Sequence, residues 1–231
     1  MFEQTPHMPA QIFSTRPSRS ALTILGLGAL AFFAFVMARI VWPYTSGRTD
    51  IDFLLTKQHI IHLLRYRAAF YLHIFPALLV LMAGLTQFSG IILRRAAGVH
   101  RWVGRIYVFS ILGVCGPAAM LMAWYANGGP IAKTSFLLLS GLWWGCTWAA
   151  YRAIRRGNIQ QHGAWMLRSY ALTLSAITLR LMQFGFAMYS DLDPETAYRI
   201  VAWPSWVLNL LAVEILLRQT GWFAWIYGPR K

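Results

Sequence analysis

The chain has 231 residues, of which 58% are hydrophobic and 12% are charged, and its mean hydropathy is +0.49. Soluble domains carry about a quarter charged residues, so this composition excludes a soluble globular protein, and its high apolar content excludes intrinsic disorder. The net charge of +14 arises from basic residues clustered between apolar runs, which indicates membrane topology rather than nucleic-acid binding.

Long apolar runs separated by short basic connections define the predicted fold. A helix needs about 20 apolar residues to cross a bilayer. We therefore predict an all-α integral membrane bundle of six transmembrane helices within one domain, residues 21–217, between tails at residues 1–20 and 218–231. The predicted spans are residues 21–41, 68–93, 103–125, 132–152, 165–188 and 200–217.

The first span follows Arg16 and Arg19, as the apolar core of a secretory signal would. It is long enough to cross the membrane and lacks a convincing small-residue cleavage site, so we predict a retained helix. The connection at residues 42–67 contains an apolar stretch from Ile51 to Leu64 that is too short to span. We expect an interfacial helix there.

The basic residues predict the orientation. Six crossings place both termini on one side, and the side richer in arginine and lysine is the cytoplasmic one. Arginines surround the second and fourth connections on the side of the termini, whereas most acids lie opposite. We therefore predict that both termini are cytoplasmic. The arginines are Arg94, Arg95, Arg101, Arg105, Arg152, Arg155, Arg156 and Arg168, and the opposing acids are Asp50, Asp52, Asp191, Asp193 and Glu195.

Four ionisable residues lie deep inside predicted spans, namely His73, Arg168, Arg180 and Glu214. A charge at the bilayer centre costs about 3 kcal/mol or more unless it is paired, so each marks a candidate site. The fifth and sixth spans are antiparallel, which brings Arg168 and Glu214 to a similar depth and predicts an ion pair. Such a pair either fixes helix register or takes part in moving protons or substrate.

Arg180 has no such partner in the sequence. Helical offsets place it on one stripe of the fifth span with Ser169, Thr173, Ala176 and Gln183. A small and polar stripe of this kind must face the bundle interior or a wet cavity.

Two histidines at a shared depth suggest a cofactor site. His100 precedes the third span and His162 precedes the fifth, and axial haem ligation needs one nitrogen from each side of the porphyrin. Gly104, one turn after His100, would leave room for the macrocycle, and Arg101 and Arg105 could pair with its propionates. The alternative is that both histidines bond headgroups or loop carbonyls beside the basic clusters.

His73 lacks a matching histidine in the fourth span, so we expect it to bond a neighbouring helix. Zinc could in principle use His59, His62 and His73 with Asp50 or Asp52, but the spacing is not specific and we predict no such site. The sequence has no phosphate-binding glycine loop, nucleophile elbow or paired-carboxylate motif, so soluble-type catalysis has no support.

Four segments of the chain carry a family resemblance: residues 71–88, 100–108, 151–162 and 165–180. As a set they resemble the predicted bacterial membrane proteins grouped as domain of unknown function 2306, over about residues 65–217. The resemblance implies a multi-helix protein of the bacterial inner membrane and supplies no mechanism. It also implies that the positions of His73, His100, His162, Arg168 and Arg180 belong to the family pattern.

A more distant similarity is to transmembrane b-type cytochromes related to ascorbate-reducible and ferric-reductase proteins, whose four-helix core holds haem between histidines on alternate helices. It implies one haem b between His100 and His162, with quinone as a candidate redox partner. The chain departs from that pattern because the fourth span offers no histidine to face His73.

Three hypotheses follow. The protein is a b-type haem electron-transfer protein, a non-catalytic or assembly subunit of a larger membrane complex, or a small transporter whose path is lined by Arg180, Arg168 and Glu214. Its expected partners are the lipid bilayer and either complex subunits or a redox partner, with no nucleic acid. Enzymatic activity is neither predicted nor excluded.

Overall fold

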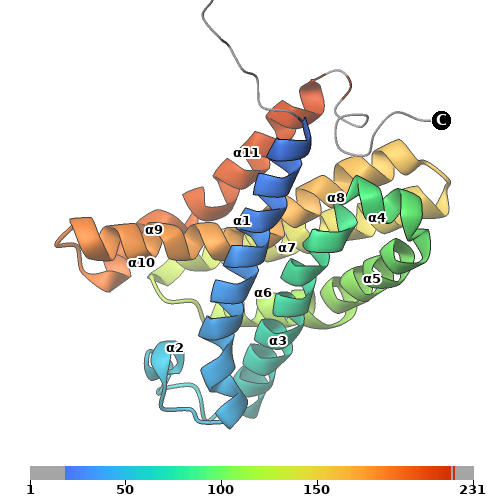
Figure 1. Cartoon of the computed structure of the whole chain (residues 1–231). Helices are drawn as coiled ribbons and strands as arrows, with labels where there is room; N and C mark the ends of the chain where they lie inside the picture. Colours follow the sequence, from blue (N-terminus) through green and yellow to red (C-terminus); the bar gives the residue numbers. More distant parts are fainter. Residues whose placement is uncertain (1–18, 220, 222–231) are drawn as a thin grey trace, which may run out of the picture.

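The computed structural model describes residues 19–219 and 221, and within them every regular element is helical. The predicted tails therefore lie almost wholly outside the described residues. Figure 1 shows the helices crossing one another in a bundle, with the start of α1 and the end of α11 on the same side. The elements are α1 (Arg19–Val41), η1 (Trp42–Ser46), α2 (Asp52–Leu55), α3 (Leu64–Gln87), α4 (Gly90–Arg95), α5 (Ala97–Phe109), η2 (Ser110–Cys115), α6 (Gly116–Trp124), α7 (Gly129–Arg155), α8 (Ile159–Thr173), α9 (Ser175–Tyr189), α10 (Pro194–Ala202) and α11 (Pro204–Arg218).

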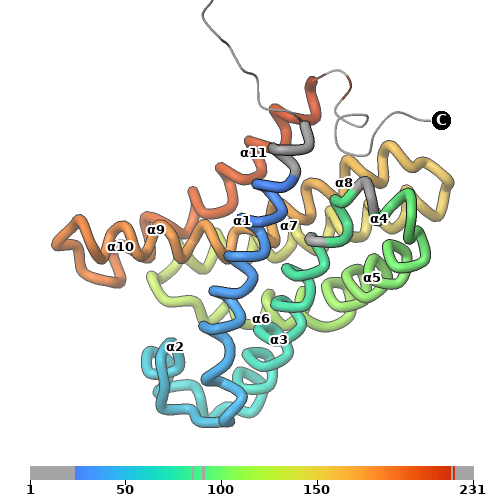
Figure 2. Tube along the Cα trace, in the orientation of Figure 1, coloured from blue at the N-terminus to red at the C-terminus, as the bar shows by residue number. Residues whose placement is uncertain are grey.

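The bundle has two sides. The α2 side carries α2 and the connections at residues 125–128 and 190–193, and the terminal side carries α4, the α7–α8 turn, the start of α1 and the end of α11. The trace in Figure 2 follows the chain between these two sides. The Lys57 ammonium donates to the carbonyl of Tyr125 at 2.6 Å, which ties the α2 region to the α6–α7 connection.

Five segments are long and apolar enough to cross a membrane: residues 24–46, 64–84, 97–124, 159–189 and 194–218. The structure thus supports a multi-pass helical membrane protein, while the predicted span at residues 132–152, which is α7, is not among the five. The reason is that α7 packs against α6, α8 and α10 and turns Ser135, Ser140 and Thr147 into the protein. The protein-facing side of a helix can carry polar residues that lipid would not accept, while Leu138, Leu142 and Trp148 on the other side of α7 are exposed.

Three predicted spans are interrupted helices. The third contains the π-helical segment η2, the fifth is divided into α8 and α9 at Leu174, and the sixth is divided into α10 and α11 at Trp203. The last break precedes Pro204, which has no backbone N–H to donate. Each interruption frees backbone carbonyls that need donors from elsewhere in the protein.

Side chains supply those donors. The Trp144 indole donates to the carbonyl of Leu112 in η2 at 3.0 Å. The Asn209 amide of α11 donates to the carbonyl of Ala171 at 3.2 Å, beside the α8–α9 break. Ser135 of α7 donates to the carbonyl of Ala202 at 2.8 Å, beside the α10–α11 break.

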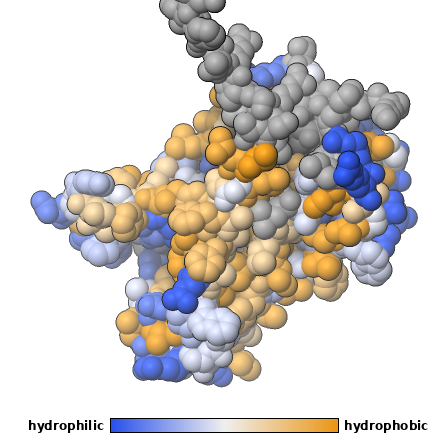
Figure 3. Space-filling view, in the orientation of Figure 1, coloured by the Kyte–Doolittle hydropathy of each residue, from blue (hydrophilic) through white to orange (hydrophobic). Residues whose placement is uncertain are grey.

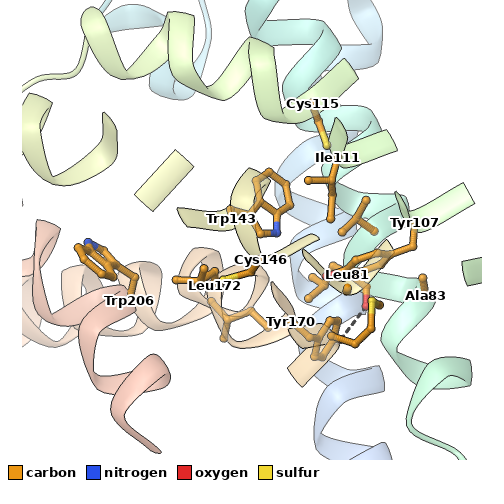
Figure 4. Packing of buried hydrophobic residues seen from close by; sticks show 14 of the residues in the cluster. Leu81, Ala83, Tyr107, Ile111, Cys115, Trp143, Cys146, Tyr170, Leu172 and Trp206 are labelled. Carbon is orange, nitrogen blue, oxygen red and sulfur yellow. Dashed lines mark hydrogen bonds between the residues drawn. The ribbon is translucent and has the colours of Figure 1, made fainter. Parts of the chain in front are cut away.

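A chain of hydroxyl groups joins the central helices. The Tyr107 hydroxyl lies 2.8 Å from that of Ser169, which lies 2.8 Å from that of Thr147. The Trp143 indole donates to the Thr173 hydroxyl at 2.9 Å. These groups connect α5, α7 and α8 at the centre of the bundle, where Figure 4 shows Tyr107 and Trp143 packed among buried apolar side chains.

Close approach of α3 to α8 depends on Gly84. A Cβ atom at residue 84 would lie 2.0 Å from the Tyr170 ring, so no other residue fits without displacing that ring. The Tyr170 hydroxyl donates to the carbonyl of Leu81 at 2.8 Å, the bond drawn as a dashed line in Figure 4. The aromatic ring thus fills the space left by the glycine while its polar end is satisfied.

The predicted ion pair between Arg168 and Glu214 is confirmed. The guanidinium binds the carboxylate through two bonds, Nε to Oε1 at 2.6 Å and Nη2 to Oε2 at 2.9 Å. Their side chains are 21% and 36% exposed in the isolated chain, and the pair joins α8 to α11. The Trp165 ring lies 4.6 Å from the guanidinium carbon and holds Arg168 in place.

We expect Glu214→Gln to lower the free energy of unfolding by about 1–2 kcal/mol, because it leaves the Arg168 charge without a counter-charge. The double change with Arg168→Gln should cost less than the sum of the two single changes. Thermal unfolding of the purified protein in mild detergent measures both effects. Strictly additive losses would show that the pair contributes no coupling energy.

Candidate functional site: a cavity on the α2 side

A cavity of about 700 Å³ lies in the half of the bundle nearer α2. Its lining comes from α1, η1, α2, α3, α6, α7, α8, α9, α10 and α11. On α3 the lining residues run from Tyr66 to Leu81, about 22 Å along a helix that rises 1.5 Å per residue. Figure 3 shows hydrophilic residues in the notch between the α9–α10 pair and α2, within an otherwise mostly apolar face. The volume is within the range of small-molecule binding sites.

The cavity has an excess of positive charge. Arg39, Lys57 and Arg180 line it, and Asp52 is the one carboxylate among its lining residues in the described part of the chain. Arg39 and Asp52 are exposed, so they lie at the mouth, whereas Lys57 is almost fully buried. An anion is the ligand that this arrangement favours.

Arg180 lies about 13 Å from the α2-side end of α9, counted by helical rise. Its Nη1 donates to the carbonyl of Ala176 on its own helix at 3.2 Å, and no carboxylate of the described residues pairs with it. Tyr44 and Tyr198 are near enough to interact with its charge. The remaining guanidinium N–H groups are available to a ligand in the cavity.

The stripe predicted for the fifth span is divided between the cavity and the hydroxyl chain. Thr173, Ala176, Arg180 and Gln183 line the cavity. Ser169 lies deeper and belongs to the hydroxyl chain. The division falls between Ser169 and Thr173, which both belong to α8 and precede the break at Leu174.

His73 also lines the cavity and bonds a neighbouring helix, as expected. Its Nδ1 lies 3.1 Å from the carbonyl of Cys115 in η2. Its ring meets that of Trp143 edge to face, with centroids 6.3 Å apart. The π-helical segment therefore exposes a carbonyl that positions the histidine at the cavity wall.

Sequence reasoning missed Lys57. It is 1% exposed, and its ammonium donates to the carbonyl of Tyr125 and to the side-chain oxygen of Asn127. Its Nζ also lies 5.6 Å from the centre of the Phe53 ring. Burial, and secondarily the charge of Lys133, lowers the pKa of Lys57 from 10.5 to about 8. The signal in the sequence was a lone cation within the apolar stretch 51–64.

His100 and His162 lie on the terminal side, away from the cavity lining. They are close enough for their charges to interact. His162 Nδ1 lies 2.9 Å from the carbonyl of Ala150, and His100 Nδ1 is buried without a hydrogen-bond partner. Arg101 and Arg105 are exposed nearby, and Arg105 stacks over Trp102 at 5.3 Å.

The room expected beside Gly104 is occupied by Gln87. A Cβ atom at residue 104 would lie 3.1 Å from the Gln87 side-chain oxygen, and the Gln87 amide donates to the carbonyl of His100 at 3.2 Å. A macrocycle could enter here only if Gln87 moved. Within the described residues, no group of three or more His, Cys, Asp or Glu side chains is placed to hold a metal ion.

The family model described as Predicted membrane protein (DUF2306) matches residues 70–217. The chain belongs to this family. The match runs from the second turn of α3 to the end of α11, so it includes His73 and Arg180 and leaves out α1 and α2. No curated protein matches the chain, and no solved structure does. These comparisons do not show the similarity to b-type cytochromes, which stays a prediction.

The pKa of Lys57 predicts how stability responds to alkaline pH. Because the folded-state pKa of about 8 lies below the ordinary 10.5, the unfolded chain holds more protons between these two values. Raising the pH from about 8 to 10.5 should therefore increase the contribution of Lys57 to stability, and below about pH 8 this contribution should be constant.

Thermal unfolding as a function of pH, compared with Lys57→Met, measures this effect. The difference between the two proteins should change in favour of the wild type as the pH rises through the window. A difference that is flat from pH 8 to 10.5 would show that the ammonium is not desolvated.

Proposed function

We propose that this membrane protein is a small transporter that binds an amphipathic organic anion in the α2-side cavity. One observation carries the proposal: Arg180 is inside the cavity and no carboxylate of the described residues neutralises it. A buried cation without a counter-ion is costly, and an anionic ligand would remove that cost. Arginine suits the task because its planar fork binds carboxylate and phosphate oxygens in pairs.

The surroundings of Arg180 support an organic rather than a simple inorganic anion. Tyr44, Tyr198 and Gln183 supply neutral hydrogen-bonding groups at the polar end of the cavity. Most of the remaining lining is apolar or aromatic, including Phe70, Phe136 and Trp143. Binding sites for small organic molecules combine a mainly apolar lining with a few placed polar groups.

The interrupted helices support transport. Leu172, Thr173 and Ser175 around the α8–α9 break line the cavity, and so does Ser205 just after the α10–α11 break. Transporters commonly place substrate sites at discontinuous helices near the membrane centre, because freed backbone groups there can be used by ligands or can change partners. The Ala171 and Ala202 carbonyls are held by side chains of other helices, which can exchange such bonds during a conformational change.

The proposal also includes the number of membrane crossings, the side of the termini and the membrane in which the protein resides. We infer that α7 is a sixth crossing, that both termini are cytoplasmic, and that the protein resides in the bacterial inner membrane. The cavity would then open on the face opposite the cytoplasm. Support comes from the arginines at the α4–α5 and α7–α8 connections on the terminal side, as the positive-inside rule requires.

Arg180→Gln should weaken the binding of octanoate by about tenfold or more, since a charge-assisted hydrogen bond contributes roughly 1.5–3 kcal/mol. The measurement is calorimetric titration of the protein in nanodiscs of zwitterionic lipid. Octanol, which has a similar chain and no charge, should bind at least tenfold more weakly than octanoate to the wild type. Arg180→Lys should fall between the wild type and the glutamine variant.

The matched control is Arg67→Gln, which removes an exposed cation of α3 that does not line the cavity. It should bind octanoate as the wild type does. Equal octanoate binding by the wild type and Arg180→Gln would refute the anion site. Loss of binding in Arg67→Gln as well would assign the effect to general surface charge.

A second candidate, haem b bound between His100 and His162, is favoured by one observation. His162 directs Nδ1 to the carbonyl of Ala150, the second-shell contact that commonly orients a metal-ligating histidine, and His100 Nδ1 is unpartnered. Bound haem would supply one-electron redox chemistry, with quinone as a candidate partner, and Arg101 and Arg105 would face its propionates. The position of Gln87 against Gly104 is the obstacle to this arrangement.

The visible spectrum of the purified protein before and after dithionite tests this candidate. The haem hypothesis predicts a reduced b-type spectrum near one haem per chain, lost in both His100→Ala and His162→Ala. A colourless protein, even after expression with added haem, would reject it. The assembly-subunit hypothesis stays a prediction, which co-purification of a stoichiometric partner would support.

A further inference from the structure

The cavity changes character along its length. Toward α2 its lining includes Lys57, Tyr44, Tyr198 and Gln183, with His73 and Arg180 farther in. Beyond these, toward the bundle centre, Thr173 and Ser175 supply hydroxyl groups, and the neighbouring lining residues are apolar: Met37, Ala77, Leu78, Leu81, Leu172 and Ala176. A lipid molecule in the α2-side leaflet has the same order, with its polar group near the surface and its chain toward the bilayer centre.

One wall of the cavity is formed by α1 and α9, which have few backbone contacts with each other. α1 contributes Met37, Ile40 and Val41 to the lining, and α9 contributes Ala176, Leu179 and Arg180. α1 packs against α3 and continues into η1, but it has no extensive packing interface with α9 or α10 within the described part of the chain. Figure 1 shows α1 crossing in front of the bundle at a steep angle to α9. The two helices therefore border the same cavity with few backbone contacts between them.

We propose that the ligand is a single-chain amphiphile with an anionic headgroup, drawn from the α2-side leaflet through the gap between α1 and α9. This inference rests on the proposed function and names its substrate class. The headgroup binds Arg180, and the chain occupies the apolar end of the cavity beside Leu78, Leu81 and Leu172. The molecule enters without inverting, because its orientation in the cavity matches its orientation in the leaflet.

Trp143 is placed to report on the chain. It lines the cavity on α7 between the polar and apolar ends, and its indole donates to Thr173. Bromine atoms quench tryptophan fluorescence on contact, so dibromostearate in the bilayer of a nanodisc is a suitable probe. The quenching of Trp143 is obtained by subtracting the quenching measured in Trp143→Phe from that measured in the wild type. This subtraction also removes the quenching of tryptophans that face lipid.

We expect this difference to saturate with dibromostearate, to be displaced by unbrominated stearate, and to fall at least tenfold in apparent affinity in Arg180→Gln. Water-soluble bromohexanoate should quench Trp143 at least tenfold more weakly. If bromohexanoate quenches as well as dibromostearate and both depend on Arg180, the ligand comes from water and the lipid inference is overturned while the anion site stands. Quenching independent of Arg180 by both probes would overturn the two proposals together.

Ala77→Phe provides a second test, because it fills the apolar end of the cavity without touching Arg180. It should abolish saturable quenching by dibromostearate and weaken octanoate binding much less, because the shorter chain occupies less of the apolar end. The matched control is Leu79→Phe, on the lipid-facing side of the same helix and outside the cavity lining. Wild-type dibromostearate binding in Ala77→Phe would place the chain elsewhere. The thermal unfolding midpoint of each variant verifies that it is folded.

Discussion

Lipid hydrocarbon offers no hydrogen-bond partner, so every polar group at membrane depth in this bundle must be satisfied by the protein itself. The central helices meet this constraint with the hydroxyl chain from Tyr107 through Ser169 to Thr147, and with indole and amide donors at the helix breaks. Arg168 meets it with Glu214. Arg180 departs from this pattern, since its own-helix carbonyl satisfies only one of its donors and no described carboxylate offsets its charge.

The helix breaks lie beside the cavity. In an uninterrupted helix each carbonyl accepts a hydrogen bond from the N–H four residues later. Beside the breaks at Leu174 and Trp203, the carbonyls of Ala171 and Ala202 accept from the side chains of Asn209 and Ser135 instead. Leu172, Ser175 and Ser205 beside these breaks line the cavity, as Arg180 and His73 do. The cavity has an excess of positive charge and an apolar inner end, and α1 and α9 have few backbone contacts along one wall. These three features together suit an amphipathic anion.

Hydropathy predicted the helical membrane bundle, and depth along antiparallel spans predicted the Arg168–Glu214 pair, because both depend on local length and simple geometry. The breaks were not predictable in this way: nothing at Leu174 resembles a helix terminus, and the donors that stabilise it come from α11. Lys57 was missed because its partners at Tyr125 and Asn127 are far away in sequence. The room beside Gly104 was expected from a missing side chain, yet Gln87 from another helix occupies it.

The central claim is that water and ligand reach Gln183, which lines the cavity, from the α2 side. We would replace the buried Cys115 and Cys146 by alanine, introduce Gln183→Cys, and label oriented vesicles with a charged, membrane-impermeant thiol reagent. The account predicts rapid labelling from the α2 side only, slowed by octanoate, with no labelling of the lipid-facing control Leu181→Cys. Equal labelling of the two cysteines, or labelling of Gln183→Cys from the terminal side alone, would contradict it.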